Sequence, residues 1–275
     1  MSDREHAVAA SLSAHELDVG YDQDIIVHGI DFAIPRNAFT ALVGANGSGK
    51  STLLKALAGL LPAKAGAVML DGRSITTLAT KSIARSIGML QQSPVAPDGL
   101  SVLELVRQGR YPHRSLFGAW SEKDETACRE AISRTGMNAL SERQIDSLSG
   151  GQRQRAWIAL ALAQETPILL LDEPTTYLDL AHQIEVMELV RRLVEEAGKT
   201  VVAVLHDLNQ AARYADHMIA LSKGAIAASG PPRSVMTEAM LREVFEVEAK
   251  IFPDPFTAAP MCIPMPHTPS DLQGL

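Results

Sequence analysis

A glycine-rich run decides the fold: Gly44-Ala45-Asn46-Gly47-Ser48-Gly49-Lys50-Ser51 fits the pattern G-x-x-x-x-G-K-[ST]. The apolar residues 39–43 just before it predict a short strand, and residues 51–61 after it have helical content. The glycines let backbone N–H groups approach phosphate oxygens, and the helix N-terminus adds a partial positive charge. This order of strand, turn and helix therefore predicts a loop that binds the phosphates of a nucleotide.

Two side chains of the run have predicted roles. Lys50 is expected to reach the β- and γ-phosphates, and the Ser51 hydroxyl is placed to ligate Mg²⁺. The alternative is a glycine-rich turn that binds nothing, and the strand-to-helix context disfavours it. The residues expected to hold the nucleotide are Gly44, Ala45, Asn46, Gly47, Ser48, Gly49, Lys50, Ser51 and Thr52.

A second motif, Leu169-Leu170-Leu171-Asp172-Glu173, places two acids at the end of an apolar strand. We expect Asp172 to face Mg²⁺ and Glu173 to act as the base for an attacking water. Two adjacent acids at the end of a buried strand are costly unless a cation or a proton meets them. Alone, the motif would be read as an acidic pair in solvent, but the upstream phosphate loop favours a metal-dependent site.

Strands and helices alternate along the rest of the chain, which predicts an α/β sheet with crossover helices. A period-two pattern over residues 26–34 puts Ile26, Ile30, Phe32 and Ile34 on one side of a strand. Further strands are expected at residues 67–70, 168–171 and 201–205, and a helix at residues 180–194.

Helix-start signals are readable between these strands. Ser101 with Glu104 and Ser121 with Asp124 have the spacing of a capping box or a close variant, and Gly136 could end the second helix. Ser149 could cap a third helix. We therefore expect one domain over residues 1–252, with a helical subdomain at about 93–147. A proline-rich tail at 253–275 is expected to extend from it.

Composition excludes several classes of protein. The 275 residues contain 25 Lys and Arg against 32 Asp and Glu, a net charge of −7 that disfavours a non-specific nucleic-acid binder. No apolar run approaches the roughly 18 residues of a membrane-spanning helix. The two cysteines have no metal-like spacing and the first residues carry no signal-peptide core, so a reduced cytoplasmic protein is expected.

A third motif, Leu148-Ser149-Gly150-Gly151-Gln152, lies between the glycine-rich loop and the acidic strand end. In it, a serine cap and two glycines open a helix N-terminus. With this pentapeptide the chain resembles the ATP-binding subunit of an ABC transporter, whose signature motif is LSGGQ. The resemblance implies a P-loop NTPase fold of the ABC type: a mixed sheet core, with a helical subdomain inserted between the Q-loop and the signature motif. It also implies ATP and Mg²⁺ as cofactors.

In this family the signature of one subunit closes on the γ-phosphate held by the other, so two subunits sandwich two ATP molecules. The resemblance therefore implies a homodimer in which Ser149, Gly150, Gly151 and Gln152 bind the partner's nucleotide.

The resemblance also implies roles for Tyr21 and Gln92. Tyr21 looks like the aromatic residue that stacks on adenine, although a tyrosine near a strand end also suits packing. Gln92 looks like the Q-loop glutamine that contacts Mg²⁺ or water and senses the permease. Gln91 is the alternative, but aligning residues 88–90 with the preceding strand favours Gln92.

Two further loops match the family. Leu178-Asp179 looks like the end of the D-loop, although Thr176 and Tyr177 depart from the small residues that are commoner there in the family. His206, directly after a predicted strand, looks like the switch histidine that contacts the γ-phosphate.

The family has several branches, and the chain resembles one of them. Chromosome-maintenance members have a long coiled coil between the motifs, translation-associated members carry two ATPase domains, and exporters are usually fused to membrane helices. What remains is a separate ATPase subunit, peripheral on the cytoplasmic face of the plasma (inner) membrane. It would dock on a polytopic permease through a surface that includes residues 103–116. A periplasmic or surface binding protein would deliver cargo, and no nucleic acid is expected as a partner.

The cargo is suggested only by likeness to a subgroup. Stretches that resemble ferric siderophore importers, with vitamin B12 and haem importers as close relatives, are residues 109–114, 153–164, 173–183, 206–211 and 253–255. A soluble ABC ATPase acting on nucleic acid or ribosomes is the alternative from another class. The basic residues Arg107, Arg110, His113 and Arg114 have a second interpretation, as a solvated or phospholipid-facing surface.

Overall fold

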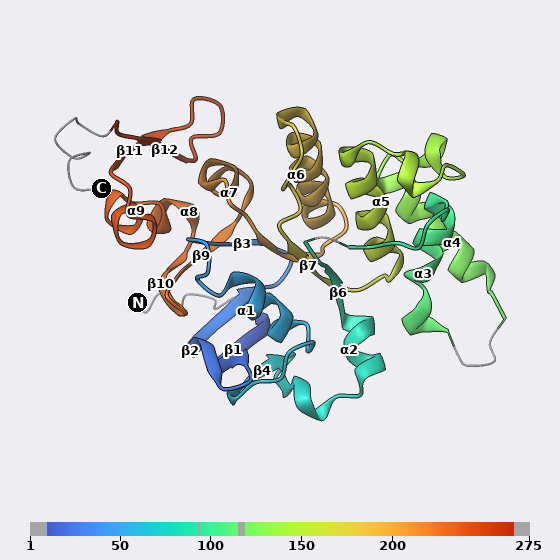
Figure 1. The fold of residues 1–275 in the computed structure, drawn as a ribbon, viewed down its shortest axis with the longest axis horizontal. Coiled ribbons are helices and arrows are strands. Elements are labelled where there is room, and N and C mark those ends of the chain that lie inside the picture. Colours follow the sequence, from blue (N-terminus) through green and yellow to red (C-terminus); the bar gives the residue numbers. More distant parts are fainter. Residues whose placement is uncertain (1–9, 93, 115–118, 267–275) are drawn as a thin grey trace, which may run out of the picture.

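The computed structural model describes residues 10–92, 94–114 and 119–266. A six-stranded sheet crosses the middle of the molecule (Figure 1). Its strands, in spatial order, are β10 (Ala225–Gly230), β9 (His217–Ser222), β3 (Phe39–Gly44), β8 (Thr200–Val204), β7 (Ile168–Asp172) and β6 (Ile87–Leu90). All neighbours pair in parallel except β10, which is antiparallel to β9, so the sheet is mixed as expected.

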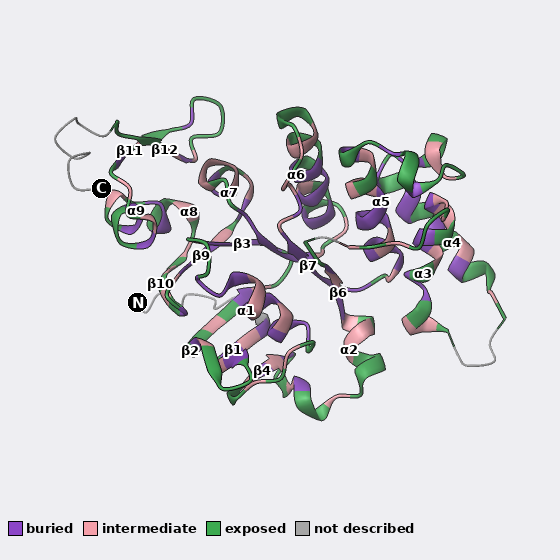
Figure 2. Cartoon of the chain, viewed as in Figure 1, coloured by how far each residue is buried: buried purple, intermediate pink, exposed green. Residues whose placement is uncertain are grey.

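The central strands β3, β7 and β8 are buried along their whole length, which Figure 2 shows as purple ribbon. Such near-continuous apolar strands are typical of a parallel sheet covered on both faces. Successive side chains alternate between two cores: Leu42 faces the core that contains α1, whereas Ala41 faces the core that contains α5 and α6. Because β3, β7 and β8 are parallel, the loops that follow them meet at one edge of the sheet.

Different elements cover the two faces of the sheet (Figure 1). Helix α1 (Lys50–Leu57) and a four-stranded antiparallel sheet lie on one side, and α6 (Leu180–Glu195) and α7 (Leu208–Tyr214) lie on the other. The antiparallel sheet has the order β2 (Asp24–Pro35), β1 (Ala10–Tyr21), β4 (Ala65–Leu70) and β5 (Arg73–Ser74). The remaining helices of the core are α2 (Thr80–Ser86), α8 (Pro232–Val235) and α9 (Glu238–Phe245).

The predicted alternation along β2 is wrong at one position. Val27 is fully buried, whereas Ile26 is only half-buried. The register of β1 and β2 shifts between the pairs Leu17↔Ile30 and Val19↔Val27, where Gly29 has φ 53°. This bulge places Val27 on the same inner face as Ile30, because one extra residue reverses the side-chain alternation.

The predicted helical subdomain lies to the right in Figure 1 and packs on α5 (Gly150–Ala163). It contains α3 (Val102–Gln108) and α4 (Glu122–Arg134), with short 3₁₀ turns at Tyr111–His113, Asn138–Leu140 and Ile145–Ser147; another such turn, Ile75–Thr77, follows β5. The capping boxes predicted at Ser101 and Ser121 are both present, as is a third at Ser149. Gly136, with φ 67°, follows the C-cap of α4.

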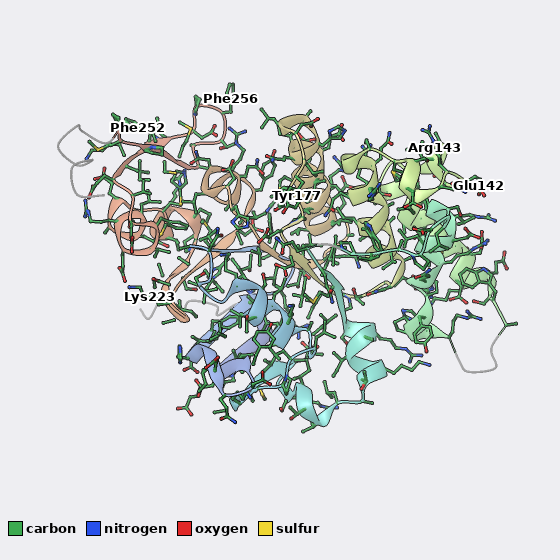
Figure 3. All side chains as sticks on the ribbon, in the orientation of Figure 1. Glu142, Arg143, Tyr177, Lys223, Phe252 and Phe256 are labelled. Carbon is green, nitrogen blue, oxygen red and sulfur yellow. The ribbon has the colours of Figure 1, made fainter. Side chains whose placement is uncertain are left out.

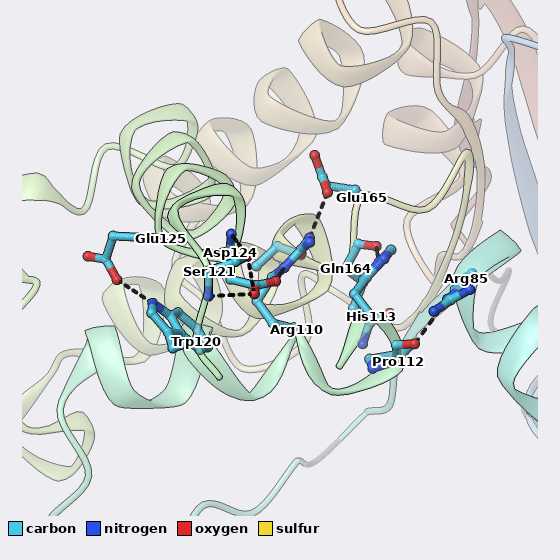
Figure 4. Close-up of polar contacts among 11 residues, drawn as sticks. Arg85, Arg110, Pro112, His113, Trp120, Ser121, Asp124, Glu125, Gln164 and Glu165 are labelled. Atoms are coloured by element: carbon cyan, nitrogen blue, oxygen red, sulfur yellow. Dashed lines mark hydrogen bonds and ion pairs between the residues drawn. The ribbon is translucent and has the colours of Figure 1, made fainter. Parts of the chain in front are cut away.

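A buried arginine joins three of these helices (Figure 4). Arg110 is 1% exposed; its Nε donates to Asp124 Oδ1 at 2.9 Å, and its Nη1 donates to Ala163 O and Glu165 Oε2, both at 2.7 Å. The interpretation of the basic stretch as a solvated or phospholipid-facing surface is therefore wrong for Arg110, which ties the end of α3 to the start of α4 and the end of α5.

Part of the expected proline-rich tail is a packed hairpin. Strands β11 (Ala249–Pro253) and β12 (Pro260–Pro264) pair antiparallel, so the predicted boundary between residues 252 and 253 falls inside β11. The side chain of Asn209 on α7 exchanges two hydrogen bonds with the backbone of Cys262, and Arg213 pairs with Asp254. The hairpin is thus fixed to α7, while residues 267–275 of the tail lie outside the described part of the chain.

Within the described residues, we find no helix with the length and hydropathy of a membrane span.

Candidate functional site

The glycine-rich loop connects β3 to α1, as predicted. Lys50 is 5% exposed, and its Nζ donates to the carbonyls of Gly44 at 2.9 Å and Ala45 at 2.8 Å. Burial lowers the pKa of Lys50, an effect that the nearby carboxylates of Glu173 and Asp172 oppose. The ammonium group is therefore held inside the curve of the loop.

Two further features of the loop suit an anion. No side chain caps the N-terminus of α1, where Gly49 is the N-cap residue, so its first N–H groups face the loop without a side-chain acceptor. The Ser48 hydroxyl is buried and has no hydrogen-bond partner among the described residues. These unpaired donors beside a buried ammonium fit the phosphate groups of a nucleotide.

A hollow of about 280 Å³ lies beside this loop. Its lining residues are Tyr21, Ile26, Asn46, Gly47, Gly49, Lys50, Ser51, Thr52 and Glu173. Tyr21, at the end of β1, is 44% exposed and stands on the wall of the hollow, where a flat ring could rest against it. The fold thus brings the predicted aromatic residue to the predicted phosphate loop.

Ser51 and Asp172 meet at the edge of the sheet, with Ser51 Oγ donating to Asp172 Oδ1 at 2.9 Å. Burial raises the pKa of Asp172, and the hydrogen bond from Ser51 opposes this shift. Hydroxyl and carboxylate oxygens are ligands that Mg²⁺ prefers, and this ion is usually held by one or two carboxylates together with substrate phosphates and waters. The pair therefore fits Mg²⁺ bound with a nucleotide.

Glu173 follows Asp172 and has a left-handed backbone, with φ 53°. Its Oε2 accepts from Gln92 Nε2 at 2.5 Å and from Thr176 Oγ1 at 3.0 Å, and its Oε1 lies 2.7 Å from His206 Nε2. The structure thus brings together Gln92, Glu173 and His206, three residues to which the resemblance gives roles in hydrolysis. Gln92 contacts Glu173 rather than the Ser51–Asp172 pair.

Thr176 contributes to the site in a way that the sequence did not predict. Thr176 stood out only as a departure from a family pattern, and no local signal showed that its hydroxyl would bond to Glu173. Tyr177 beside it is 90% exposed with φ 64°; Figure 3 labels it near the start of α6.

Ser149 and Gln152 form the signature's capping box: Gln152 N donates to Ser149 Oγ at 3.3 Å and Ser149 N donates to Gln152 Oε1 at 3.2 Å. Gly151 packs tightly against His182 of α6, since a Cβ at Gly151 would lie 2.2 Å from His182 Cδ2. Residues 149–152 do not line the hollow beside Lys50. Figure 1 accordingly shows α5 among the helices at the right and α1 below the central sheet.

A family model described as "ABC transporter" matches residues 27–176, more than half of the chain. The chain belongs to the ABC transporter family. It is an ATP-binding subunit that hydrolyses ATP, and as an importer ATPase it partners with a membrane permease.

Two curated ABC proteins illustrate the similarity. The achromobactin transport ATP-binding protein of Dickeya dadantii is 48% identical over 254 residues, which cover 92% of this chain and 94% of that protein. The iron(3+)-hydroxamate import ATP-binding protein of Bacillus subtilis is 49% identical over 253 residues, with 92% and 94% covered.

Solved ABC structures agree with the fold. One, described as a metal-chelate type ABC transporter in an inward-facing conformation, matches with a TM-score of 0.82 and 29% identity, covering 95% of this chain and 99% of that one. A dimeric bacterial ABC transporter cassette matches with a TM-score of 0.70 and 30% identity, covering 80% and 98%. The predicted fold, an ABC-type ATPase, is confirmed.

Proposed function

We propose that this ATP-binding subunit powers the import of a ferric siderophore through a polytopic membrane permease. Support for the cargo comes from the relatives above, whose names specify achromobactin and iron(3+)-hydroxamate. Support for the chemistry comes from one observation: the Glu173 carboxylate is held by three side chains beside the Ser51–Asp172 pair and the phosphate loop.

The proposed mechanism assigns each group a task. The loop from Gly44 to Thr52, with Lys50, holds the phosphates, and Tyr21 stacks on the adenine. Ser51, Asp172 and Gln92 would hold Mg²⁺, and the ion would supply positive charge that offsets the negative charge of the phosphates.

Glu173 accepts a proton from the attacking water while Gln92 orients its carboxylate. His206 contacts Glu173 and senses the γ-phosphate. All these groups come from a single chain.

The proposed site needs a second copy of the chain. Ser149, Gly150, Gly151 and Gln152 open the N-terminus of α5, whose partial positive charge suits the γ-phosphate held by a partner subunit. Binding of two ATP molecules would close the homodimer and push on the permease, and hydrolysis would reopen it. The subunit would lie on the cytoplasmic face of the inner membrane, receive cargo from a binding protein through the permease, and have no nucleic-acid partner.

Co-purification from detergent-solubilised membranes, followed by uptake assays with ⁵⁵Fe-labelled siderophore, tests the proposal. We expect an integral membrane permease in the complex, and uptake that is lost in cells carrying Glu173→Gln. The matched control is Glu196→Gln, at an exposed position after α6, which should keep wild-type uptake. Uptake of ferric siderophore that persists with Glu173→Gln would contradict the proposed role of this subunit as the motor, and uptake of vitamin B12 or haem in place of ferric siderophore would contradict the proposed cargo.

A further inference from the structure

Two glutamine side chains join α6 to α7 behind the site. Gln210 Nε2 donates to Gln183 Oε1 at 2.7 Å, and Gln183 Nε2 donates to the carbonyl of Leu178 at 2.9 Å. The Leu178 carbonyl can only accept, so it fixes the orientation of the Gln183 amide, whose oxygen then faces Gln210. The two amides therefore form a directed chain of hydrogen bonds from α7 to the turn before α6.

Both ends of this chain lead to Glu173. Leu178 belongs to the turn of residues 173–179, in which Thr176 donates to the Glu173 carboxylate. At the other end, the N–H of Gln210 is capped by Asp207, which directly follows His206, the other neighbour of that carboxylate. The contacts form a closed ring in which two of the three groups that hold Glu173, Thr176 and His206, are also tied to each other.

The backbone does not make this tie. Among the described residues, no backbone hydrogen bond joins residues 173–179 to residues 206–210. Gln183 and Gln210 are both half-buried, so water competes less for their hydrogen bonds than at an exposed position. The pairing of β7 with β8 ends at Asp172↔Val204, so beyond the strands the polar contacts that join the turn to the His206 loop are those of these two side chains and of Glu173.

We propose that Gln183 and Gln210 are positioning residues that set the distance between the 173–179 turn and the His206 loop, and so orient the Glu173 carboxylate for hydrolysis. The inference rests on the proposed role of Glu173 as the base. It also gives a structural role to Gln183 and Gln210, which lie in the stretches 173–183 and 206–211 that resemble siderophore importers.

Steady-state hydrolysis of Mg-ATP by the purified full chain tests this role. Gln183→Leu and Gln210→Leu should each lower kcat about tenfold and change KM for ATP less than about twofold, because a small displacement of the carboxylate slows the reaction without weakening nucleotide binding. The double variant should be no slower than either single variant, since both changes break one chain. Gln144→Leu, at an exposed position in the helical subdomain, is the matched control and should keep wild-type kcat.

A further variant separates positioning from stability. Gln183→Glu keeps an acceptor for Gln210 but removes the donor to Leu178, so it should lose kcat like Gln183→Leu. The double leucine variant removes both partners of the amide pair and leaves only the half-buried turn at Leu178 without a side-chain donor, so its melting temperature should fall little. Wild-type kcat in that variant, additive losses, or losses that follow a lowered melting temperature would each overturn the inference.

Comparison with Glu173→Gln separates the proposed role of Glu173 from the positioning role of Gln183 and Gln210. If Glu173→Gln hydrolyses ATP at the wild-type rate, the proposed role of Glu173 fails. If Glu173→Gln is inactive while the leucine variants have normal kcat, the positioning role alone fails.

Discussion

At the scale of single residues, the Glu173 carboxylate is held on both oxygens, by Gln92 and Thr176 on one and by His206 on the other. A side chain fixed in this way loses little further freedom when a water molecule must be aligned beside it. Its left-handed backbone, with φ 53°, costs conformational energy that the surrounding contacts must offset. This geometry suits a general base that must be held in a fixed position beside the attacking water.

Replacing this carboxylate by an amide tests its role. Glu173→Gln should lower the rate of ATP hydrolysis by roughly 10²- to 10⁴-fold, because general-base catalysis contributes about that much. The dissociation constant for ATP should change little, since the phosphate loop is intact. Phosphate-release assays and equilibrium binding measure the two quantities, and equal turnover in the variant and the wild type would rule out Glu173 as the base.

The two glycines of the signature motif offer a matched pair. A Cβ at Gly151 would lie 2.2 Å from the His182 ring, whereas a Cβ at Gly150 would lie 3.7 Å from Leu178. Gly151→Ala should therefore cost about 1–3 kcal/mol of unfolding free energy through overpacking. Gly150→Ala should stay within about 0.5 kcal/mol. Urea denaturation measures both, and equal values would show that His182 moves aside freely.

At the scale of elements, the sequence predicted local structure better than long-range contacts. The capping boxes at Ser101 and Ser121 were predictable because each involves residues three positions apart. Strand β1 was not predicted, and the bulge at Gly29 reversed the expected alternation along β2, because both depend on pairing between strands. The bond from Thr176 to Glu173 was not predicted either, because it depends on the turn that follows β7, in which Glu173 and Tyr177 both have positive φ.

Arg110 shows how far a long-range contact can overturn a local interpretation. It lies in a basic stretch, yet its partners include Glu165, which is distant in the sequence. Arg110→Met should destabilise the chain by about 3–5 kcal/mol, because it leaves Asp124 buried without its cation. Arg129→Met, which removes an exposed guanidinium that pairs with the half-buried Glu125, should cost less than about 1 kcal/mol. Similar costs for the two variants in chemical denaturation would show that Arg110 is not a structural link.

The same link predicts a dependence on pH. Hydrogen bonds from Ser121, and then from Arg110, lower the pKa of Asp124 from 3.8 to about 2. Because the folded pKa lies below the unfolded one, the ionised carboxylate stabilises the fold above about pH 4, and this contribution is lost as the pH falls toward 2. The difference in unfolding free energy between the wild type and Asp124→Asn should therefore shrink between pH 4 and pH 2. A difference that stays constant over this range would contradict the assignment.

At the scale of the whole molecule, the parallel strands explain why the candidate site could be predicted. Residues that follow β3, β7 and β8 meet at one sheet edge, so motifs far apart in the sequence come together. The C-terminal hairpin was not predicted, because its contacts with Asn209 and Arg213 lie on another element. The signature at residues 149–152 does not line the hollow beside Lys50. Within one chain, the phosphate loop therefore has no signature motif facing it.

The most direct test of the account is the mass of Glu173→Gln in solution with and without ATP, measured by light scattering coupled to gel filtration. A single chain has a mass of 29.5 kDa. We expect the variant to elute at twice that mass with ATP bound, and at the mass of one chain without nucleotide, because ATP held on one copy is covered by the signature of the other. A variant that binds ATP and stays at 29.5 kDa would contradict the account.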